Sequence, residues 1–340
     1  MSKKNLTVKG ALIRLYNHQY KDYTRFVAAE ENKDKASLFA KFIEMKFAEF
    51  IDIVKLIAPD DLLQFIARLD DFVPNKTRIR FINLLKIICK KYLIILRKCY
   101  CSNPVDAIKD LEKLLGAHNH KLTKYINEQL VNYCTYTINN NEILYRVRDE
   151  KASNNVDNCW HVPFNIRQYS YSGRFSSPGF PCLYLSNNIE TCLSEVRQLK
   201  SEYKRWIGEF SINNDRILLT LDLRFPSHNT IAHMNDYDMF CAFLSYPIRL
   251  LCGIPALHKS DSFAEEYLFS QLLINLLSNP TNDKFGLTSI RGVTYDSTKH
   301  VGGINYAFPA VPKHYPPEGD EKVSERLKIL LFHSKPYPLS

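Results

Sequence analysis

The spacing of the apolar residues changes near residue 140, and this change limits what the chain can fold into more than any other feature. Before it, apolar residues recur every three or four positions, and Phe39, Ile43, Phe47 and Phe50 form one such stripe, which is typical of a helix with one buried face. Residues 143–148 alternate apolar and polar residues, as a half-buried strand does, and short apolar runs such as 180–186 follow, as in buried strands. The sequence therefore predicts a helical bundle followed by a domain that contains a sheet.

The helical bundle is expected to form the first domain, residues 1–138. Prolines and helix-capping residues separate its predicted helices. These helices span residues 11–29, 36–58, 60–72, 77–101, 104–116 and 119–131. A polar, asparagine-rich segment at 137–142 is typical of a linker and marks the boundary.

The second domain is expected to span residues 139–312. Its predicted strands are 143–148, 180–186, 204–210, 216–223 and 290–295, and its predicted helices are 189–199, 239–252 and 262–278. Because strands and helices do not alternate regularly, the pattern favours an α+β fold. The proline-rich, basic residues 313–340 are expected to form a C-terminal tail.

The net charge of the chain is +9, from 45 Lys and Arg against 36 Asp and Glu. This surplus suits an anionic ligand or a nucleic acid, but lysines on solvated helix faces account for it more simply. The sequence contains neither GxGxxG nor GxxxxGK[ST]. It therefore supports neither a Rossmann oxidoreductase nor a P-loop NTPase.

The nine cysteines stand at scattered positions, without a CxxC pair or a cluster with histidine. No metal site is therefore expected, and the thiols are expected to stay reduced in the cytoplasm. No apolar run of signal-peptide type follows the basic N-terminus. The most apolar predicted helix is interrupted by Lys86, Lys90 and Lys91, so no membrane span is expected.

Residues 171–199 carry the most informative local pattern, a loop followed by a short strand and a helix. Glycines and prolines shape the loop, and Arg174 lies within it. On the helix, Ile189, Cys192 and Leu199 belong to a buried stripe, and Glu195 lies at the edge of that stripe. An arginine in a rigid loop and a glutamate at the margin of a core could face one site.

This stretch resembles the RES family, which is named for an arginine, a glutamate and a serine. The resemblance covers about residues 143–310 and rests on ordered motifs: Leu144-Tyr145-Arg146-Val147, Gly173-Arg174, Pro178-Gly179-Phe180-Pro181, Leu183-Tyr184, Ser194-Glu195-Val196, Gly292-Val293-Thr294-Tyr295-Asp296-Ser297 and Gly302-Gly303-Ile304-Asn305. Phe175-Ser176 departs from the Trp-Asn of the family pattern, which affects the loop but not the arginine. The resemblance implies a domain similar to ADP-ribosyltransferase cores and a toxin that degrades NAD.

The resemblance makes Arg174, Glu195 and Ser297 the expected catalytic residues. A guanidinium can bind two phosphate oxygens of NAD in a planar fork, which suits Arg174. Breaking the nicotinamide–ribose bond develops positive charge on the ribose, which an ionised Glu195 would stabilise. The Ser297 hydroxyl could bind the pyrophosphate, the ribose or an incoming phosphate. The structural alternatives are a salt bridge for Arg174, a surface position for Glu195 and a turn-stabilising role for Ser297.

Four further residues are candidates for binding NAD. Arg146 suits the phosphates, and Arg148 is its rival two residues along the same strand face. Tyr184 either belongs to the core or meets the nicotinamide. Asn305 is an additional candidate.

A helix that precedes the last predicted strand carries Tyr267 and Gln271 four residues apart, so the two share a face. The RES family has a similar tyrosine and glutamine ahead of its last strand. This pair is therefore expected to lie near the site.

The expected function is cleavage of NAD between nicotinamide and ribose. A NAD glycohydrolase would pass the ADP-ribose to water, and a NAD phosphorylase would pass it to inorganic phosphate. NAD is then the substrate, and no separate cofactor is expected. The resemblance also implies an antitoxin protein as a partner. The alternatives are an ADP-ribosyltransferase that modifies a macromolecule and a non-catalytic protein that binds a nucleotide or a partner.

The predicted bundle does not carry a clear nuclease motif. Helical HEPN domains place four to six residues between an arginine and a histidine, whereas Arg14 and His18 have three residues between them. The bundle resembles the HEPN fold only weakly. We expect it to pack on the second domain, to bind a partner or to form a homo-oligomer.

Overall fold

The computed structural model describes residues 5–17, 19–29, 35–69, 77–115, 133–149, 156–196, 205–213, 216–257, 264–278, 289–312, 323–333 and 336–339. Contacts divide the chain into two compact units. Unit 1 comprises Met1–Cys134 and Phe225–Leu257, and unit 2 comprises Thr135–Arg224 and His258–Ser340. The predicted helix 119–131, His18 and Leu199 lie outside the described residues.

Unit 1 is built from helices, as predicted. They are α1 (Val8–Tyr16), α2 (Gln19–Ala29), α3 (Lys35–Lys55), α4 (Pro59–Arg68), α5 (Arg78–Tyr100), α6 (Pro104–Leu115), α9 (His228–His233) and α10 (Asp236–Gly253). The apolar stripe of α3 is covered, with Phe39 and Phe50 fully buried. Thr77 caps α5, because its hydroxyl accepts a hydrogen bond from the backbone N of Arg80.

The helix α10 lies at the centre of unit 1, although it is far along the chain. Every residue of α10 from Met239 to Gly253 is buried. The ring centroid of Tyr246 lies 4.6 Å from that of Phe50, and Phe243 lies 5.9 Å from Phe81. A helix that is apolar on all sides needs neighbours on all sides. Residues 225–257 therefore belong with the first unit, which differs from the predicted domain 139–312.

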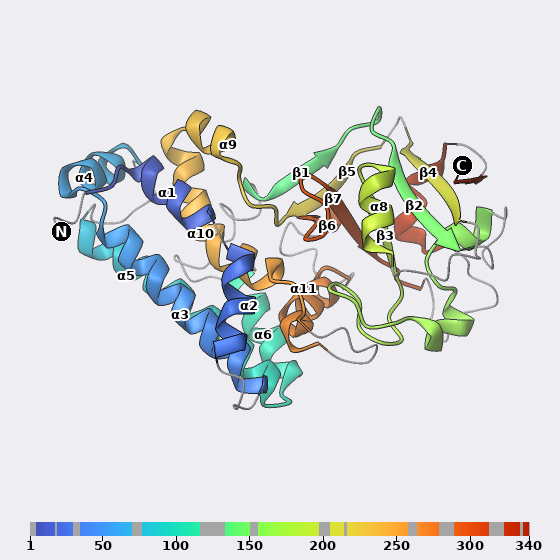
Figure 1. Cartoon of the computed structure of the whole chain (residues 1–340), viewed down its shortest axis with the longest axis horizontal. Coiled ribbons are helices and arrows are strands. Elements are labelled where there is room, and N and C mark those ends of the chain that lie inside the picture. The colour runs from blue at the N-terminus through green and yellow to red at the C-terminus, as the bar shows by residue number, and fades with distance from the viewer. Residues whose placement is uncertain are drawn as a thin grey trace. The chain divides into compact units, whose positions relative to one another are not determined.

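Unit 2 is a mixed sheet with helices packed on it, and the α+β fold is confirmed (Figure 1). Its strands are β1 (Thr135–Ile138), β2 (Leu144–Asp149), β3 (Cys182–Ser186), β4 (Arg205–Ile212), β5 (Leu218–Asp222), β6 (Ile290–Asp296), β7 (Ile304–Pro309), β8 (Leu330–Phe332) and β9 (Tyr337–Pro338). Its α-helices are α8 (Ile189–Glu195) and α11 (Leu268–Ser278), and the 3-10 segments are η3 (Val156–Cys159), η4 (Phe164–Tyr169), η5 (Glu265–Tyr267) and η8 (Glu325–Leu327).

The strands are ordered β1-β5-β6-β7-β3-β2-β4-β8, and β9 also pairs with β4. Among the strand pairs of the described residues, β5 and β6 run parallel and the others run antiparallel. The strands β2 and β3 pair only at Tyr145 and Ser186, so the two strands separate beyond that point. No helix of the described residues combines the length and apolar character that crossing a membrane requires.

The two faces of the sheet carry different clusters. One face gathers the larger core, with Leu144, Trp160 and Phe210 among its members. On the other face, Val147 of β2 packs with Cys192 of α8, and Figure 1 shows α8 lying over β2 and β3. Because successive side chains of a strand point to opposite faces, every second residue of β3, β6 and β7 lies on the α8 face.

The predicted C-terminal tail is wrong for the part of it that the structure describes. The strands β8 and β9 extend the sheet beside β4, with Leu330 opposite Ile212 and Tyr337 opposite Ile207. Leu327 is fully buried. Short strands at a sheet edge carry little periodicity, so their pattern is hidden by the prolines and lysines around them.

Candidate active site

A tight turn at residues 173–176 holds Arg174. The backbones of Gly173 and Ser176 bond to each other in both directions, with N···O distances of 2.9 and 3.3 Å. The hydroxyl of Tyr184, on β3, accepts a hydrogen bond of 3.0 Å from the backbone N of Phe175. The same hydroxyl donates a bond of 3.0 Å to Ser176 Oγ. Tyr184 thus fixes the turn to the sheet.

Gln271 of α11 holds the same turn from a second element. Its Nε2 donates to the carbonyl oxygens of Gly173 at 2.9 Å and Ser176 at 3.2 Å, and lies 3.1 Å from Ser172 Oγ. A side chain has no room at Gly173, because a Cβ there would lie 2.8 Å from both Ser176 Oγ and the Tyr184 hydroxyl. The close packing explains why a glycine precedes the arginine.

The side chain of Arg174 packs against two tyrosine rings and is only 8 % exposed. Its Cζ lies 5.2 Å from the ring centroid of Tyr295, on β6, and 5.7 Å from that of Tyr267, in η5. A planar guanidinium on aromatic faces keeps its N–H edges for hydrogen bonds. Burial raises the pKa of Tyr295. The positive charge of Arg174 lowers this pKa, and the negative charge of Glu195 raises it. Tyr295 therefore lies near both charges.

The carboxylate of Glu195 is met by side chains from two other segments. Ser297 Oγ, just after β6, donates to Oε1 at 2.7 Å, and Asn305 Nδ2, on β7, donates to the same oxygen at 2.9 Å. Lys299 Nζ lies 3.3 Å from Oε2 and donates to the backbone oxygen of Glu195 at 2.8 Å. The structure thus brings together three of the predicted site residues, Glu195, Ser297 and Asn305.

Glu195 lies at the C-terminal end of α8, where its negative charge does not stabilise the helix. The predicted helix 189–199 ends early, because α8 stops at Glu195 and Val196 has extended backbone angles. A negative charge at the C-terminal end of a helix opposes the helix dipole. Burial would raise the pKa of Glu195, but the bond from Ser297, the Lys299 charge and the bond from Asn305 outweigh it and hold this pKa below its usual value. The carboxylate is therefore ionised at neutral pH.

Further hydrogen bonds orient the groups that bind Glu195. Ser186 Oγ donates to Asn305 Oδ1 at 2.6 Å, so the amide nitrogen of Asn305 is left for the carboxylate. Ser297 Oγ accepts from the backbone N of Lys299 at 3.2 Å and of His300 at 3.0 Å. Its own hydrogen is thus committed to Glu195. This arrangement does not favour Ser297 as a nucleophile.

Arg174 and Glu195 lie on the same face of the sheet. In the strand register, Asn305 of β7 is opposite Tyr295 of β6 on one side and Ser186 of β3 on the other. Residues directly opposite each other in antiparallel strands point to the same face. Arg174 packs on Tyr295 and Glu195 is bonded to Asn305, so the two charged groups lie over adjacent strands.

The structure does not bring Arg146 and Arg148 into contact with this cluster. Arg146 is opposite Gly208, and both lie on the face of β2 and β4 that carries Leu144, away from α8. Arg146 is 9 % exposed, and its Nη1 is buried without a hydrogen-bond partner among the described residues. Burial and the charge of Arg148 hold the pKa of Arg146 well below its usual value. Arg148 donates from Nη2 to the Trp160 oxygen at 3.2 Å. Their binding roles stay predictions.

Lys299 and Ser186 contact the candidate site residues, but neither lies in any of the sequence motifs given above. Each lies two residues from a predicted site residue, Ser297 and Tyr184 respectively. The alternation of strand side chains places Ser186 on the face of Tyr184, which is the one signal that could have identified it.

Part of the chain is similar to known proteins. The family model described as RES domain matches residues 143–324, which contain Arg174, Glu195 and Ser297. A protein of Bacillus subtilis (strain 168), named "Putative toxin YopC", is 25 % identical over 155 residues, or 42 % of this chain and 33 % of that protein. The chain thus spans about a third of the length of this relative. No solved structure matches, so the likeness to ADP-ribosyltransferase cores stays a prediction. Because the family model covers more than half of it, the chain belongs to the RES domain family.

Proposed function

We propose that unit 2 cleaves NAD between nicotinamide and ribose, as a NAD glycohydrolase or a NAD phosphorylase. The RES domain family is linked to toxin enzymes that act on NAD, and the matched Bacillus subtilis protein is named as a toxin. We further propose that this protein acts as a toxin in the cytoplasm and that an antitoxin protein restrains it.

The observation that carries the proposal is the ionised Glu195 beside Ser297 and Asn305, on the same face as Arg174. Nicotinamide leaves as a neutral molecule, so its departure needs no acid. The positive charge that develops on the ribose does need stabilisation. A carboxylate fixed by hydrogen bonds supplies it without reorganising during the reaction.

The cations of the site suit the phosphates of the substrate. The guanidinium of Arg174 lies over the rings of Tyr295 and Tyr267, and a guanidinium can bind two phosphate oxygens in a planar fork. Ser297 and Asn305 bind Oε1 of the Glu195 carboxylate, whereas Lys299 approaches Oε2. An ammonium there could attract an incoming phosphate, and Glu195 could orient either a water or a phosphate for attack on the ribose.

The direct test is incubation of the purified full chain with NAD, with and without inorganic phosphate, followed by chromatography. We expect nicotinamide release, with free ADP-ribose if water is the acceptor and a phosphorylated ADP-ribose if phosphate is. Glu195→Gln should abolish the release, whereas Glu190→Gln, an exposed position on the same helix, should not. Absence of release from the wild type, or equal release from Glu195→Gln, would contradict the proposal.

The same assay separates the alternative functions. An ADP-ribosyltransferase would transfer label from NAD to a macromolecule. A binding protein would give a calorimetric NAD signal without loss of NAD. The toxin role is tested separately, by expressing the wild type and Glu195→Gln in bacteria. We expect the wild type alone to lower viable counts and cellular NAD.

A further inference from the structure

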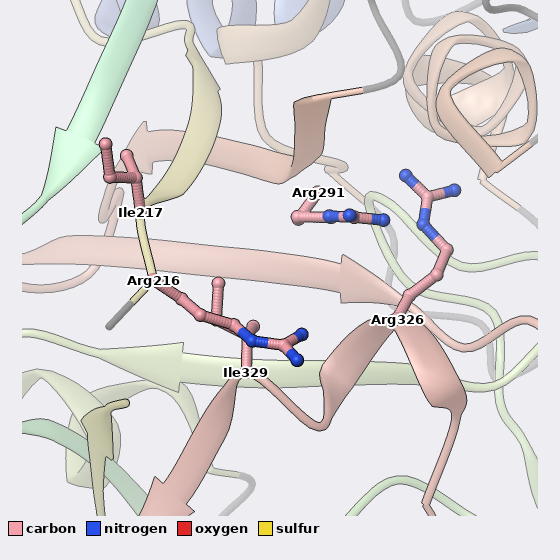
Figure 2. Close-up of a pocket in the computed structure, with 5 residues that line it drawn as sticks. All are labelled: Arg216, Ile217, Arg291, Arg326 and Ile329. Atoms are coloured by element: carbon pink, nitrogen blue, oxygen red, sulfur yellow. The ribbon is translucent and has the colours of Figure 1, made fainter. Parts of the chain in front are cut away.

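A charged hollow lies in unit 2, away from the candidate active site. Its volume is about 460 Å³, within the range of about 300–1,000 Å³ that small-molecule sites occupy. Its lining consists of Arg216, Ile217, Arg291, Arg326 and Ile329, which we call the arginine hollow. Figure 2 shows the side chains of Arg216 and Arg291 running toward the side where Arg326 stands.

The topology of the sheet gathers these arginines. The strands β5 and β6 are parallel, so their amino ends meet at one edge of the sheet. Arg216 lies just before β5, and Arg291 is the second residue of β6. Arg326, in η8, joins the end of α11 to the start of β6, because Nη1 donates to the Leu277 oxygen at 2.7 Å and Nη2 to the Ile290 oxygen at 2.9 Å.

Among the lining residues that the structure describes, no carboxylate balances the positive charge of the hollow. Within the part of the chain that the structure describes, the side chains of Arg216 and Arg291 make no ion pair, and Arg326 Nε is buried without a hydrogen-bond partner. Burial, and then the charge of Arg291, lower the pKa of Arg326 to about 10. Guanidiniums held this close repel each other, and a bound anion would remove that repulsion.

We infer that the arginine hollow binds a small molecule through a linear di- or triphosphate group. Arg216 and Arg291 offer N–H donors in planar forks that match phosphate oxygens, and Arg326, whose Nη atoms hold the Leu277 and Ile290 oxygens, adds positive charge beside them. A single phosphate would leave part of that positive charge uncompensated. The Ile217 side chain is 69 % exposed at the rim, where it can cover an apolar part of the ligand. The limited volume favours a small molecule over a nucleic-acid strand.

This site is separate from the one that we propose for NAD cleavage. Ser297 follows the carboxyl end of β6, whereas Arg291 lies near its amino end. About 20 Å of strand separates the two positions, at roughly 3.3 Å per residue. The inference therefore stands whether or not unit 2 cleaves NAD.

The test is calorimetric titration of the full chain with inorganic tripolyphosphate, and in a second arm with ATP, which carries the same group on a nucleoside. We expect saturable binding of both that weakens with added salt. Arg216→Gln and Arg291→Gln should each weaken binding by about tenfold to a hundredfold, the range for losing a hydrogen bond to a charged group. Because Arg326 also supports the fold, it is left unchanged.

Two variants serve as controls. Arg167→Gln removes an exposed arginine of the same unit and should bind as the wild type does. Arg174→Gln tests the candidate active site: tripolyphosphate binding that is lost in this variant but kept in the Arg216→Gln/Arg291→Gln double variant would overturn the inference. Undiminished binding in the Arg216→Gln/Arg291→Gln double variant would overturn the inference. The inference would also be overturned if the chain bound a single-stranded RNA through these two arginines and did not bind tripolyphosphate.

Discussion

Ser297 donates a hydrogen bond of 2.7 Å from Oγ to Oε1 of Glu195, although 102 residues separate them along the chain. This bond joins the end of β6 to the end of α8 and helps to keep the carboxylate ionised. The proposed chemistry depends on that ionised state, so the bond links the fold directly to the reaction.

Replacing Ser297 by alanine should raise the pKa of Glu195. The hydrogen bond from Ser297 is the largest of the effects that lower this pKa. The acid limb of the pH profile of nicotinamide release should therefore move to higher pH. Ser194→Ala is the matched control, because among the described residues its hydroxyl bonds the Thr191 oxygen and not Glu195, and its loss should leave the profile in place. An unshifted acid limb in Ser297→Ala would contradict this role.

The same pair of residues should affect acid stability. The pKa of Glu195 is lower in the folded protein than its usual value, and about 4.3 is usual for an unfolded chain. Its contribution to the free energy of unfolding is therefore present above about pH 4.3 and is lost as the pH falls through the folded pKa. Ser297→Ala should shrink this loss. Unfolding free energies measured across this pH range check it, and an identical pH dependence in both proteins would contradict it.

Alanine substitutions at Gly173 and Gly179, two glycines of one loop, should separate effects on stability from effects on activity. Gly173→Ala would force a Cβ to within 2.8 Å of Ser176 Oγ and the Tyr184 hydroxyl, at a cost of about 1–3 kcal/mol. Gly179→Ala meets no neighbour within 4 Å, but Gly179 has φ +79, which costs an alanine about 1–2 kcal/mol. Thermal unfolding should show both losses. Only Gly173→Ala should lower NAD turnover, because it displaces the turn that holds Arg174.

Arg174→Lys should weaken NAD binding although it keeps the charge. A lysine cannot stack on Tyr295 and Tyr267 or bind two phosphate oxygens in a fork. We expect the KM for NAD to rise by about tenfold to a hundredfold, with a smaller change in kcat. Arg167→Lys, at an exposed position, should leave both constants unchanged. Equal KM values for Arg174→Lys and the wild type would remove Arg174 from the binding site.

Arg146 and Arg148 can be told apart by replacing each with methionine. Arg146 is buried with a donor that lacks a partner among the described residues, so Arg146→Met should leave the unfolding free energy unchanged or raise it by about 1 kcal/mol. If Arg146 binds phosphate as predicted, the same variant should weaken NAD binding. Arg148→Met breaks the bond to the Trp160 oxygen and should cost stability instead. If Arg148→Met weakened NAD binding and Arg146→Met cost stability, the phosphate would be assigned to Arg148.

Much of the fold could be predicted from apolar spacing, and the exceptions have physical reasons. The helices of unit 1 and the strands β2 to β6 follow strong periodic patterns. The spacing places residues 239–252 in the second domain, whereas they pack with unit 1, because a helix buried on every side does not reveal its neighbours. The spacing does not predict the strand β7, because Asn305 interrupts the apolar pattern of that strand. Asn305 donates a hydrogen bond to Glu195, so a polar residue of the candidate site breaks the apolar pattern of this strand.

The site could be predicted only where motifs carry it. Arg174, Glu195 and Ser297 stand in motifs that resemble the RES family, and the structure places them on one face of the sheet. The supporting contacts are a different matter. Lys299 approaches Glu195 from a loop, and Gln271 holds the Arg174 turn from α11. Such contacts depend on three-dimensional packing, which residue spacing does not determine.

The most direct measurement is the rate of nicotinamide release by the full chain and by Glu195→Gln, with NAD binding followed by calorimetry on both proteins. We predict that the variant binds NAD with similar affinity and releases nicotinamide about 10²–10³-fold more slowly, the usual effect of removing one electrostatic stabiliser. Glu190→Gln should match the wild type. Equal rates for Glu195→Gln and the wild type, or no release by either, would contradict the account.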